Sequence, residues 1–304
     1  MAVNVLITGG SGLLAVNWAL ALRDTCSLTL GVHDRVVSLK GVQTHKFNLN
    51  SVDDLVRDFE LNQINIVVHA AGLTSVELCE VKPELARYIN VQLALNVARA
   101  CAKLGLPLIH ISTDHLFAGT KALVHEDCPV APLNVYGLTK AEAEQRVLQA
   151  HPMALVVRTN FFGWGPSYRR SFSDFILEAL RLGKEITLFE DVLYSPIIIK
   201  TLALAAHTLL DKKANGIFHV VGNERTSKYE FGCKVAKEFG LDASLIKPGF
   251  LADQARLVSR PHDMSLSNQK TCRLIGKKLG SVADYIAILH QQEQTGHAHE
   301  IAKL

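Results

Sequence analysis

The chain has 304 residues, a formal net charge of +3 and 48% hydrophobic residues. Its length suits one large α/β domain or two smaller ones, and its composition is ordinary for a globular protein. The small net charge and the scattered basic residues do not favour nucleic acid or a membrane surface as a partner.

The six cysteines include no CxxC pair, which favours buried thiols in a reducing compartment over a disulfide framework. A strand pattern begins almost at the N-terminus, without a basic leader before it. The longest apolar stretch, 195–210, is interrupted by Lys200 and His207 and falls short of the roughly 20 residues of a membrane helix. We therefore expect a soluble, cytoplasmic protein.

Short apolar, β-branched runs alternate with helical patterns through the first half of the chain. Strands are expected at 3–8, 28–32, 44–49, 64–72, 106–113 and 154–159. Helices are expected at 12–24, from Ser51 onward, at 83–104 and after "NVYGLTK" (134–140). This alternation is typical of a parallel sheet covered on both faces. The predicted fold class is α/β, a Rossmann-type doubly wound parallel sheet with a smaller C-terminal substrate-binding lobe.

The second half alternates less regularly. Its expected elements are a helix at 171–184, a strand at 216–222, and a helix that a Ser227–Glu230 capping box starts and Gly240 ends. We expect 1–160 to form the dinucleotide-binding domain, with part of 190–222 returning to it. Residues 161–304 would mainly form the substrate-binding lobe, and the polar stretch 291–300 would fray.

The sequence "TGGSGLLA" (8–15) follows the first expected strand and opens a helix. Glycine permits a tight turn and lets backbone N–H groups approach a pyrophosphate at a helix N-terminus. The small Ala15, three residues beyond the last glycine, permits close helix–sheet packing. Because the motif lies between a strand and a helix, it predicts a dinucleotide site. The cofactor-binding residues predicted in this turn are Gly9, Ser11, Gly12 and Leu13.

The end of the second strand bears on the choice between NADP and NAD. The position that commonly holds an acid for the adenosine ribose falls near His33, which Asp34 and Arg35 follow. His33 and Arg35 could hold a 2′-phosphate, whereas Asp34 directed at the ribose would favour NAD. The sequence favours NADP and leaves NAD open.

Tyr136 and Lys140 are four residues apart in "NVYGLTK", so both side chains leave the same face of a helix. An unperturbed phenol titrates near pH ~10, and a nearby ammonium lowers that value and makes proton donation to a carbonyl oxygen feasible near neutrality. The fifth expected strand ends in "ISTD" (111–114), which presents hydroxyls at the carboxyl edge of the sheet, where α/β proteins bind ligands. Together these parts predict a hydride-transfer site.

These motifs resemble those of the extended short-chain dehydrogenase/reductase superfamily and, more narrowly, those of the dTDP-4-dehydrorhamnose reductases. The resemblance covers most of the chain and includes "ITGGSGLLA", "VVHAAGLTSVELCE", "ISTDHLFAGT", "EDCPVAPLNVYGLTKAEAE", "VVRTNFFGWG" and "GIFHVVGNERTSKYE". The middle stretches are specific to the narrower family, whereas the glycine turn is specific only to the superfamily.

The resemblance implies roles for residues around both expected ligands. Thr113, beside Ser112, would hydrogen-bond the substrate carbonyl. Tyr136 would be the general acid, and Lys140 would be its electrostatic partner and a ligand of the nicotinamide ribose. The cofactor would also contact Asn48, Leu49, Ala70, Ala71 and Gly72. The substrate would contact Thr74, Asp114, His115, Asn160 and Phe161.

Two further residues keep two interpretations each. Asn90 could serve in a proton relay, as a catalytic residue, or could be a structural amide inside its helix. Arg158 could lie near nicotinamide and substrate, together with Thr159, or could form a buried structural ion pair.

The sequence departs from the family pattern in the expected substrate pocket. His115 stands where the family usually has tyrosine. Phe161 takes the place of a tryptophan found in many relatives, with Trp164 nearby, and Tyr194 replaces a common glycine. These differences concern the sugar rather than the hydride chemistry. His115 itself would be a polar wall residue or a second acid.

The predicted function is NAD(P)H-dependent reduction of a 4-keto sugar nucleotide. A second interpretation is a sugar-nucleotide epimerase or dehydratase, although "STDHLF" lacks the glutamate that dehydratases usually carry there. A third is a non-catalytic NADP-binding regulatory subunit that resembles the β subunit of methionine adenosyltransferase. No metal site is expected, because the histidines lack zinc-type spacing. A homodimer through helices 83–104 and 134–150 is expected.

Overall fold

The computed structural model describes residues 3–254 and 257–304, and its centre is a seven-stranded sheet. The strand order is β11-β6-β5-β4-β1-β2-β3, and every neighbouring pair is parallel. The strands are β1 (Asn4–Thr8), β2 (Ser27–Val32), β3 (Gln43–Lys46), β4 (Ile66–His69), β5 (Leu108–Ile111), β6 (Leu155–Arg158) and β11 (Gly216–His219). The predicted Rossmann-type α/β fold is confirmed, and the strand expected at 216–222 joins this sheet beside β6.

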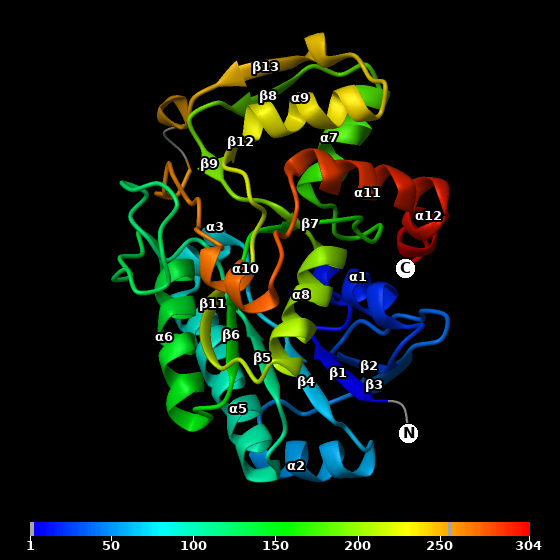
Figure 1. Cartoon of the computed structure of the whole chain (residues 1–304), viewed down its shortest axis with the longest axis vertical. Helices are drawn as coiled ribbons and strands as arrows, with labels where there is room; N and C mark the ends of the chain where they lie inside the picture. Colours follow the sequence, from blue (N-terminus) through cyan, green and yellow to red (C-terminus); the bar gives the residue numbers. More distant parts are fainter. Residues whose placement is uncertain (1–2, 255–256) are drawn as a thin grey trace.

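Helices cover both faces of the sheet (Figure 1). One face is covered by α1 (Leu13–Leu22) and α8 (Ile199–Asp211), the other by α2 (Val52–Leu61), α5 (Leu93–Leu104) and α6 (Val135–Ala150). Side chains alternate between the two faces along a strand. Thus Ile7 packs into the cluster that contains Trp18, while Leu6 packs into the cluster that contains Phe59. Burial on both faces explains the nearly continuous apolar strands.

The helix expected at 83–104 is present but is not uniform. It consists of α4 (Pro83–Arg87), a π-helical turn η1 (Tyr88–Gln92) and α5, and the short α3 (Val76–Val81) precedes it. Asn90 lies on the π-helical turn. Such turns are often found at functional sites.

The remaining elements form a smaller lobe above the carboxyl ends of the strands, at the top of Figure 1. Its larger elements are α7 (Phe172–Arg181), β8 (Ile186–Phe189), α9 (Lys228–Glu238), β13 (Ile246–Gly249) and α11 (Val282–Gln294). Helix α10 (Gln269–Ile275) instead packs against α8 and β11 of the sheet domain. Its shorter strands are β7 (Phe161–Phe162), β9 (Leu193–Tyr194), β10 (Ile197–Ile198) and β12 (Thr226–Ser227), and its short 3-10 turns are η2 (Ala243–Leu245) and η3 (Leu251–Asp253). The predicted capping box of Ser227 and Glu230 starts α9.

No helix within 3–254 or 257–304 is long and apolar enough to cross a membrane.

The C-terminal segment corrects the expectation that 291–300 frays. Helix α11 continues to Gln294, and α12 (His297–Ala302) follows and packs against α1. The side chain of Ile301 is completely buried in the main core. Arg23 Nη1 on the α1 side donates to Glu300 Oε1 at 2.6 Å. The polar composition of the segment concealed the buried Ile301 just beyond it; Ala298 and Leu304 also pack against the same core.

If the tail is part of the core, Ile301→Ala should lower the free energy of unfolding by about 2–4 kcal/mol, because it removes buried methylenes and leaves a cavity. Urea unfolding measures this change. Leu61→Ala is the matched control, since Leu61 is 73% exposed and its truncation should have little effect. A loss of unfolding free energy below about 0.5 kcal/mol for Ile301→Ala would instead support the expectation that the tail frays.

Candidate active site

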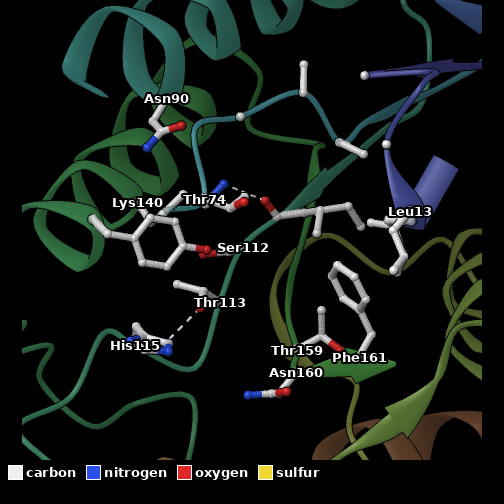
Figure 2. Close-up of a pocket in the computed structure, with 18 of the residues that line it drawn as sticks. Leu13, Thr74, Asn90, Ser112, Thr113, His115, Lys140, Thr159, Asn160 and Phe161 are labelled. Atoms are coloured by element: carbon white, nitrogen blue, oxygen red, sulfur yellow. Dashed lines mark hydrogen bonds between the residues drawn. The ribbon is translucent and has the colours of Figure 1, made fainter. Parts of the chain in front are cut away.

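A cleft of about 570 Å³ opens at the carboxyl ends of the central strands (Figure 2). Its walls come from the turn after β1, the loop after β4, the end of β5, the start of α6 and the segment after β6. It brings together these predicted site residues: Gly9, Ser11, Gly12, Leu13, Ala70, Ala71, Gly72, Thr74, Asn90, Thr113, Asp114, His115, Tyr136, Lys140, Asn160 and Phe161. The predicted His33, Arg35, Asn48 and Leu49 are not in its lining.

The glycine turn is shaped by backbone geometry. Gly9 has a φ of +70°, in the left-handed region that glycine adopts without strain. A Cβ on Gly9 would lie 2.9 Å from the Cα and N of Ala71. Gly12 donates its N–H to the Gly9 carbonyl at 2.7 Å, which closes the turn just before α1 begins at Leu13. The turn therefore directs the N-terminus of α1 at the cleft, where a phosphate would be stabilised.

The end of β5 supplies hydroxyl groups to the cleft. Figure 2 shows Thr113 and His115 across the cleft from Leu13 and Phe161. Thr113 Oγ1 donates to Asp114 Oδ1 at 3.3 Å and accepts from the backbone N–H of His115 at 3.2 Å. These two weak contacts hold the hydroxyl at the surface of the cleft and leave it able to reach a ligand.

Asp114 and His115 belong to the same wall but differ in character. Asp114 is buried and accepts a hydrogen bond from Asn160 Nδ2 at 2.6 Å. Burial lowers the pKa of His115, with the charge of Asp114 acting in the opposite direction. The ring of His115 packs edge-on against Tyr136, with 5.6 Å between centroids. An imidazole that is neutral near pH 7 favours the interpretation of His115 as a polar residue of the wall over its interpretation as a second acid.

Helix α6 places Tyr136 and Lys140 on the cleft. Asn134 Oδ1 accepts from Gly137 N at 2.9 Å, and this cap starts the helix just before Tyr136. Both Tyr136 and Lys140 line the cleft and are mostly buried. Lys140 Nζ donates to the carbonyl of Ile111 at 2.7 Å, so the ammonium is anchored to the end of β5.

The expectation that Lys140 lowers the pKa of Tyr136 is wrong for this structure. Burial raises the pKa of Tyr136 to about 12, and the Thr113 hydroxyl opposes that rise only in part. Burial also lowers the pKa of Lys140 to about 8, with Glu144 acting in the opposite direction. The physical reason is that desolvation dominates both groups, while the ammonium is committed to a backbone carbonyl.

Asn90 has the contacts of a structural amide. Its Oδ1 accepts from Leu73 N at 2.7 Å, and its Nδ2 donates to Leu73 O at 3.1 Å and to Thr139 Oγ1 at 3.0 Å. Both amide hydrogens are therefore used. The side chain ties the loop after β4 to α6, and these contacts favour the structural interpretation over the proton relay.

Arg158 forms the buried ion pair that the sequence left as one of two interpretations. Its guanidinium is 3% exposed and Glu144 is 4% exposed. Arg158 Nη2 donates to Glu144 Oε2 at 2.7 Å, and Nε donates to Oε1 at 3.0 Å. The ion pair joins β6 to α6 below the cleft, so the structural interpretation is confirmed.

Of the adenine-side predictions, His33, Arg35 and Asn48 are exposed beyond the cleft, and Leu49 is partly buried against the core of the α2–α5 face. His33 Nδ1 lies 3.0 Å from Asp34 Oδ2, and both side chains are exposed. Arg35 lies over the ring of Tyr168, with 3.9 Å between Cζ and the centroid. Asn48 donates to a neighbouring carboxylate on α2.

A second cavity of about 340 Å³ shares His115, Asn160 and Phe172 with the cleft. Its lining contains two cations, Lys228 and Arg260, and no acidic residue. The rest of its lining is mostly apolar, namely Phe175, Leu188, Phe189, Val192, Leu251 and Met264. The sequence analysis missed this cavity, because its residues come from several separate segments of the smaller lobe.

Lys228 is the unusual residue of this cavity. Its Nζ lies 3.4 Å from the centroid of the Tyr194 ring and 4.8 Å from that of Phe172. Burial lowers its pKa to about 8, partly offset by the charge of Asp114. No carboxylate of the described chain lies within ion-pair distance of Nζ. An anionic ligand would relieve this desolvated charge.

Within 3–254 and 257–304, no group of three or more His, Cys, Asp or Glu side chains has an arrangement that could hold a metal ion.

Comparison with known proteins places the chain in a family. Residues 3–292 match the family described as RmlD substrate binding domain, so the chain belongs to this family. A dTDP-4-dehydrorhamnose reductase of Mycolicibacterium smegmatis is 32% identical over 283 residues, which cover 90% of this chain and 80% of that protein. The methionine adenosyltransferase 2 subunit beta of Mus musculus is 31% identical over 263 residues, which cover 81% of this chain and 75% of that protein.

Solved structures share the fold. A dTDP-4-dehydrorhamnose reductase from Bacillus anthracis str. Ames in complex with NADP has a TM-score of 0.84 at 23% identity, over 96% of this chain and 100% of that chain. A hypothetical dTDP-4-dehydrorhamnose reductase from Sulfolobus tokodaii has a TM-score of 0.79 at 28% identity, over 91% of this chain and 97% of that chain. The likeness extends through both the sheet and the smaller lobe.

The lowered pKa of Lys140 predicts a pH-dependent stability. Between a folded-state pKa of about 8 and the ordinary value near 10.5, the unfolded chain binds more protons than the folded one. Stability therefore rises with pH across this window. Between about pH 7 and pH 10, the wild type should gain about 1–3 kcal/mol of unfolding free energy relative to Lys140→Met.

Denaturant unfolding at several pH values measures this difference. Lys103→Met, at an exposed position, is the control and should show no such gain. A difference in unfolding free energy between wild type and Lys140→Met that stays constant from pH 7 to pH 10 would show that the ammonium is not desolvated.

Proposed function

We propose that the protein reduces a 4-keto sugar nucleotide with NAD(P)H. The observation that carries the proposal is the position of the Thr113 and Tyr136 hydroxyls, which face the same cleft as the glycine turn. A dinucleotide held by the turn and lying past Ala71 would bring its nicotinamide towards these hydroxyls. Membership of the RmlD substrate binding domain family and the relation to dTDP-4-dehydrorhamnose reductases support the same chemistry.

The residues of the cleft would divide the reaction between them. A bound reduced nicotinamide supplies the hydride. Thr113 Oγ1 would donate a hydrogen bond to the carbonyl oxygen of the substrate. Tyr136 carries its proton at neutral pH, since its pKa is raised to about 12, and would transfer it to that oxygen as negative charge develops there. Lys140 would hold the nicotinamide ribose.

The second cavity suits the nucleotide part of the substrate. Lys228 and Arg260 would bind the diphosphate, and the aromatic rings of Phe175 and Phe189 would contact the base. The sugar would then lie at the junction near His115, beside Tyr136. We therefore assign substrate binding to the smaller lobe, within 161–304, and dinucleotide binding mainly to 1–160 with β11.

NADP is the favoured cofactor, and NAD stays open. Arg35 offers a guanidinium at the end of β2 and forms no ion pair with the described residues. Such a group would suit a 2′-phosphate, whereas the Asp34 carboxylate would suit a free ribose. The six free cysteines support a reducing compartment, which we propose is the cytoplasm.

Tyr136→Phe tests the chemistry directly. Affinity for NADPH and NADH should change little, while oxidation of NADPH by a panel of 4-keto sugar nucleotides should fall by roughly 10²-fold or more. Fluorescence titration and absorbance at the nicotinamide band measure the two quantities. Tyr229→Phe, on α9 and outside the cleft lining, is the control. Turnover that survives in Tyr136→Phe would refute the assigned acid.

The regulatory-subunit and the epimerase or dehydratase interpretations predict different results in the same assay of NADPH oxidation. The methionine adenosyltransferase β subunits are nearly as similar as the reductase, which favours a regulatory partner role as the second candidate. In that case the protein would bind NADPH, show no oxidation with any sugar, and capture a methionine adenosyltransferase catalytic subunit in a pull-down. An epimerase or dehydratase would convert sugar nucleotides without net oxidation of NADPH.

We also propose a homodimer through the helices at 83–104 and 134–150. Most apolar side chains of these helices face the core, but Leu85, Tyr88 and Leu138 are exposed. Sedimentation should give twice the chain mass, and Leu138→Asp should shift the protein to monomer by burying a charge in the interface. Leu182→Asp, exposed on the smaller lobe, should not. A monomeric wild type would remove the proposal.

A further inference from the structure

The loop 165–171, called the clasp here, is closed at its base by one carboxylate. It connects the segment after β7 to α7. Asp174 Oδ2 accepts from Gly165 N and from Ser171 N, each at 2.8 Å, and Asp174 is buried. A Cβ on Gly165 would collide with the carbonyl oxygen of Arg169, so the base admits only glycine. The two ends of the clasp are therefore fixed, and its tip is held out over the cleft.

The tip of the clasp contacts both walls of the cleft. Tyr168 Oη donates to the Ser11 carbonyl at 2.8 Å, on the turn after β1. Arg169 Nη2 donates to Thr74 Oγ1 at 2.6 Å, on the loop after β4. Ser11, Thr74 and Arg169 all line the cleft. Two hydrogen bonds thus join the smaller lobe to the two loops between which a dinucleotide would lie.

The same tip brings positive charge to the cleft. Arg169 forms no ion pair within 3–254 or 257–304, and its charge is among those that lower the pKa of Tyr136 against the effect of burial. Arg35 lies on the other side of the clasp, over the Tyr168 ring. The aromatic ring of Tyr168 therefore fixes the position of Arg35, since a stacked guanidinium loses little freedom when it binds.

We propose that Tyr168 and Arg169 retain the dinucleotide and that Tyr168 also determines the choice between NADPH and NADH. The clasp lies over the bound cofactor, and its two hydrogen bonds must break before the cofactor leaves. The Tyr168 ring holds Arg35 where a 2′-phosphate would bind, so loss of the ring weakens NADPH more than NADH. This inference rests on dinucleotide binding, as proposed above, and does not depend on which sugar is reduced.

Two substitutions of Tyr168 separate the hydrogen bond from the ring. Tyr168→Phe keeps the ring under Arg35 and removes the bond to Ser11. It should raise the dissociation rates of NADPH and NADH alike, about three- to tenfold, and should raise their association rates as well, because the same bond closes the empty cleft. Tyr168→Leu removes both contacts, and should in addition lower the preference for NADPH over NADH about threefold. Arg169→Ala should raise both dissociation rates as Tyr168→Phe does.

Stopped-flow displacement of bound NADPH and NADH from the full chain measures the rates, and fluorescence titration measures the affinities. Tyr285→Phe is the matched control, because the buried Tyr285 hydroxyl has no hydrogen-bond partner in the described structure and lies off the cleft. Its rates should equal those of the wild type. Thermal unfolding with each variant establishes that it is folded.

The outcomes separate this inference from the proposed function. A wild type that binds neither dinucleotide would overturn both. A wild type that binds them, with unchanged dissociation rates in both Tyr168→Phe and Arg169→Ala, would overturn the clasp and leave the function standing. Faster dissociation in Tyr168→Leu with an unchanged preference for NADPH would overturn the role of Tyr168 in cofactor choice.

Discussion

The hydrogen bond from Lys140 Nζ to the carbonyl of Ile111 determines the geometry of the cleft. It joins α6 to the end of β5, so the phenol on the helix and the hydroxyl at the strand end meet on one wall. The Asn134 cap sets where α6 begins, and the Arg158–Glu144 ion pair joins the same helix to β6. These three polar contacts, together with the Asn90–Thr139 hydrogen bond, position the residues to which we assign the chemistry.

The same arrangement has an energetic consequence. A buried ammonium and a buried phenol are each driven towards their neutral forms, since desolvation penalises charge. Tyr136 therefore keeps its proton over the whole physiological range. In the proposed reaction, the energy needed to release that proton would have to come from the charge that develops on the substrate. Lys228 in the second cavity is a further desolvated cation, and the positive charge of the nearby Arg260 also lowers its pKa.

Much of the fold was predictable from the sequence, because its signals are local. The apolar runs around Leu6 and Ile7 specify a strand buried on both faces, and the turn at Gly9 needs the backbone freedom that only glycine has. The seven strands of the sheet, the glycine turn and the Tyr136–Lys140 spacing follow from such patterns, whereas most other residues of the main cleft were implied by the family resemblance. The structural role of Asn90 was one of two open interpretations, since its partners come from separate segments.

The features that the sequence did not reveal depend on tertiary contacts. Lys228 is noteworthy only because the ring of Tyr194 packs under it, and "TSKYE" alone carries no sign of that. The stretch "PSYRRS" (166–171) carries no sign that Tyr168 and Arg169 contact Ser11 and Thr74. The pKa of Tyr136 depends on burial, which no spacing of residues measures. The polar tail concealed its anchor, Ile301, for the same reason.

The most direct measurement uses NADPH carrying deuterium on the transferable position of nicotinamide C4, mixed with the protein and a 4-keto sugar nucleotide. If the cleft beside Tyr136 carries out the proposed reduction, the deuterium should appear at C4 of the sugar as the cofactor is oxidised. Tight binding of the labelled cofactor with no deuterium in any sugar would contradict it, and would leave a nucleotide-binding protein without this chemistry.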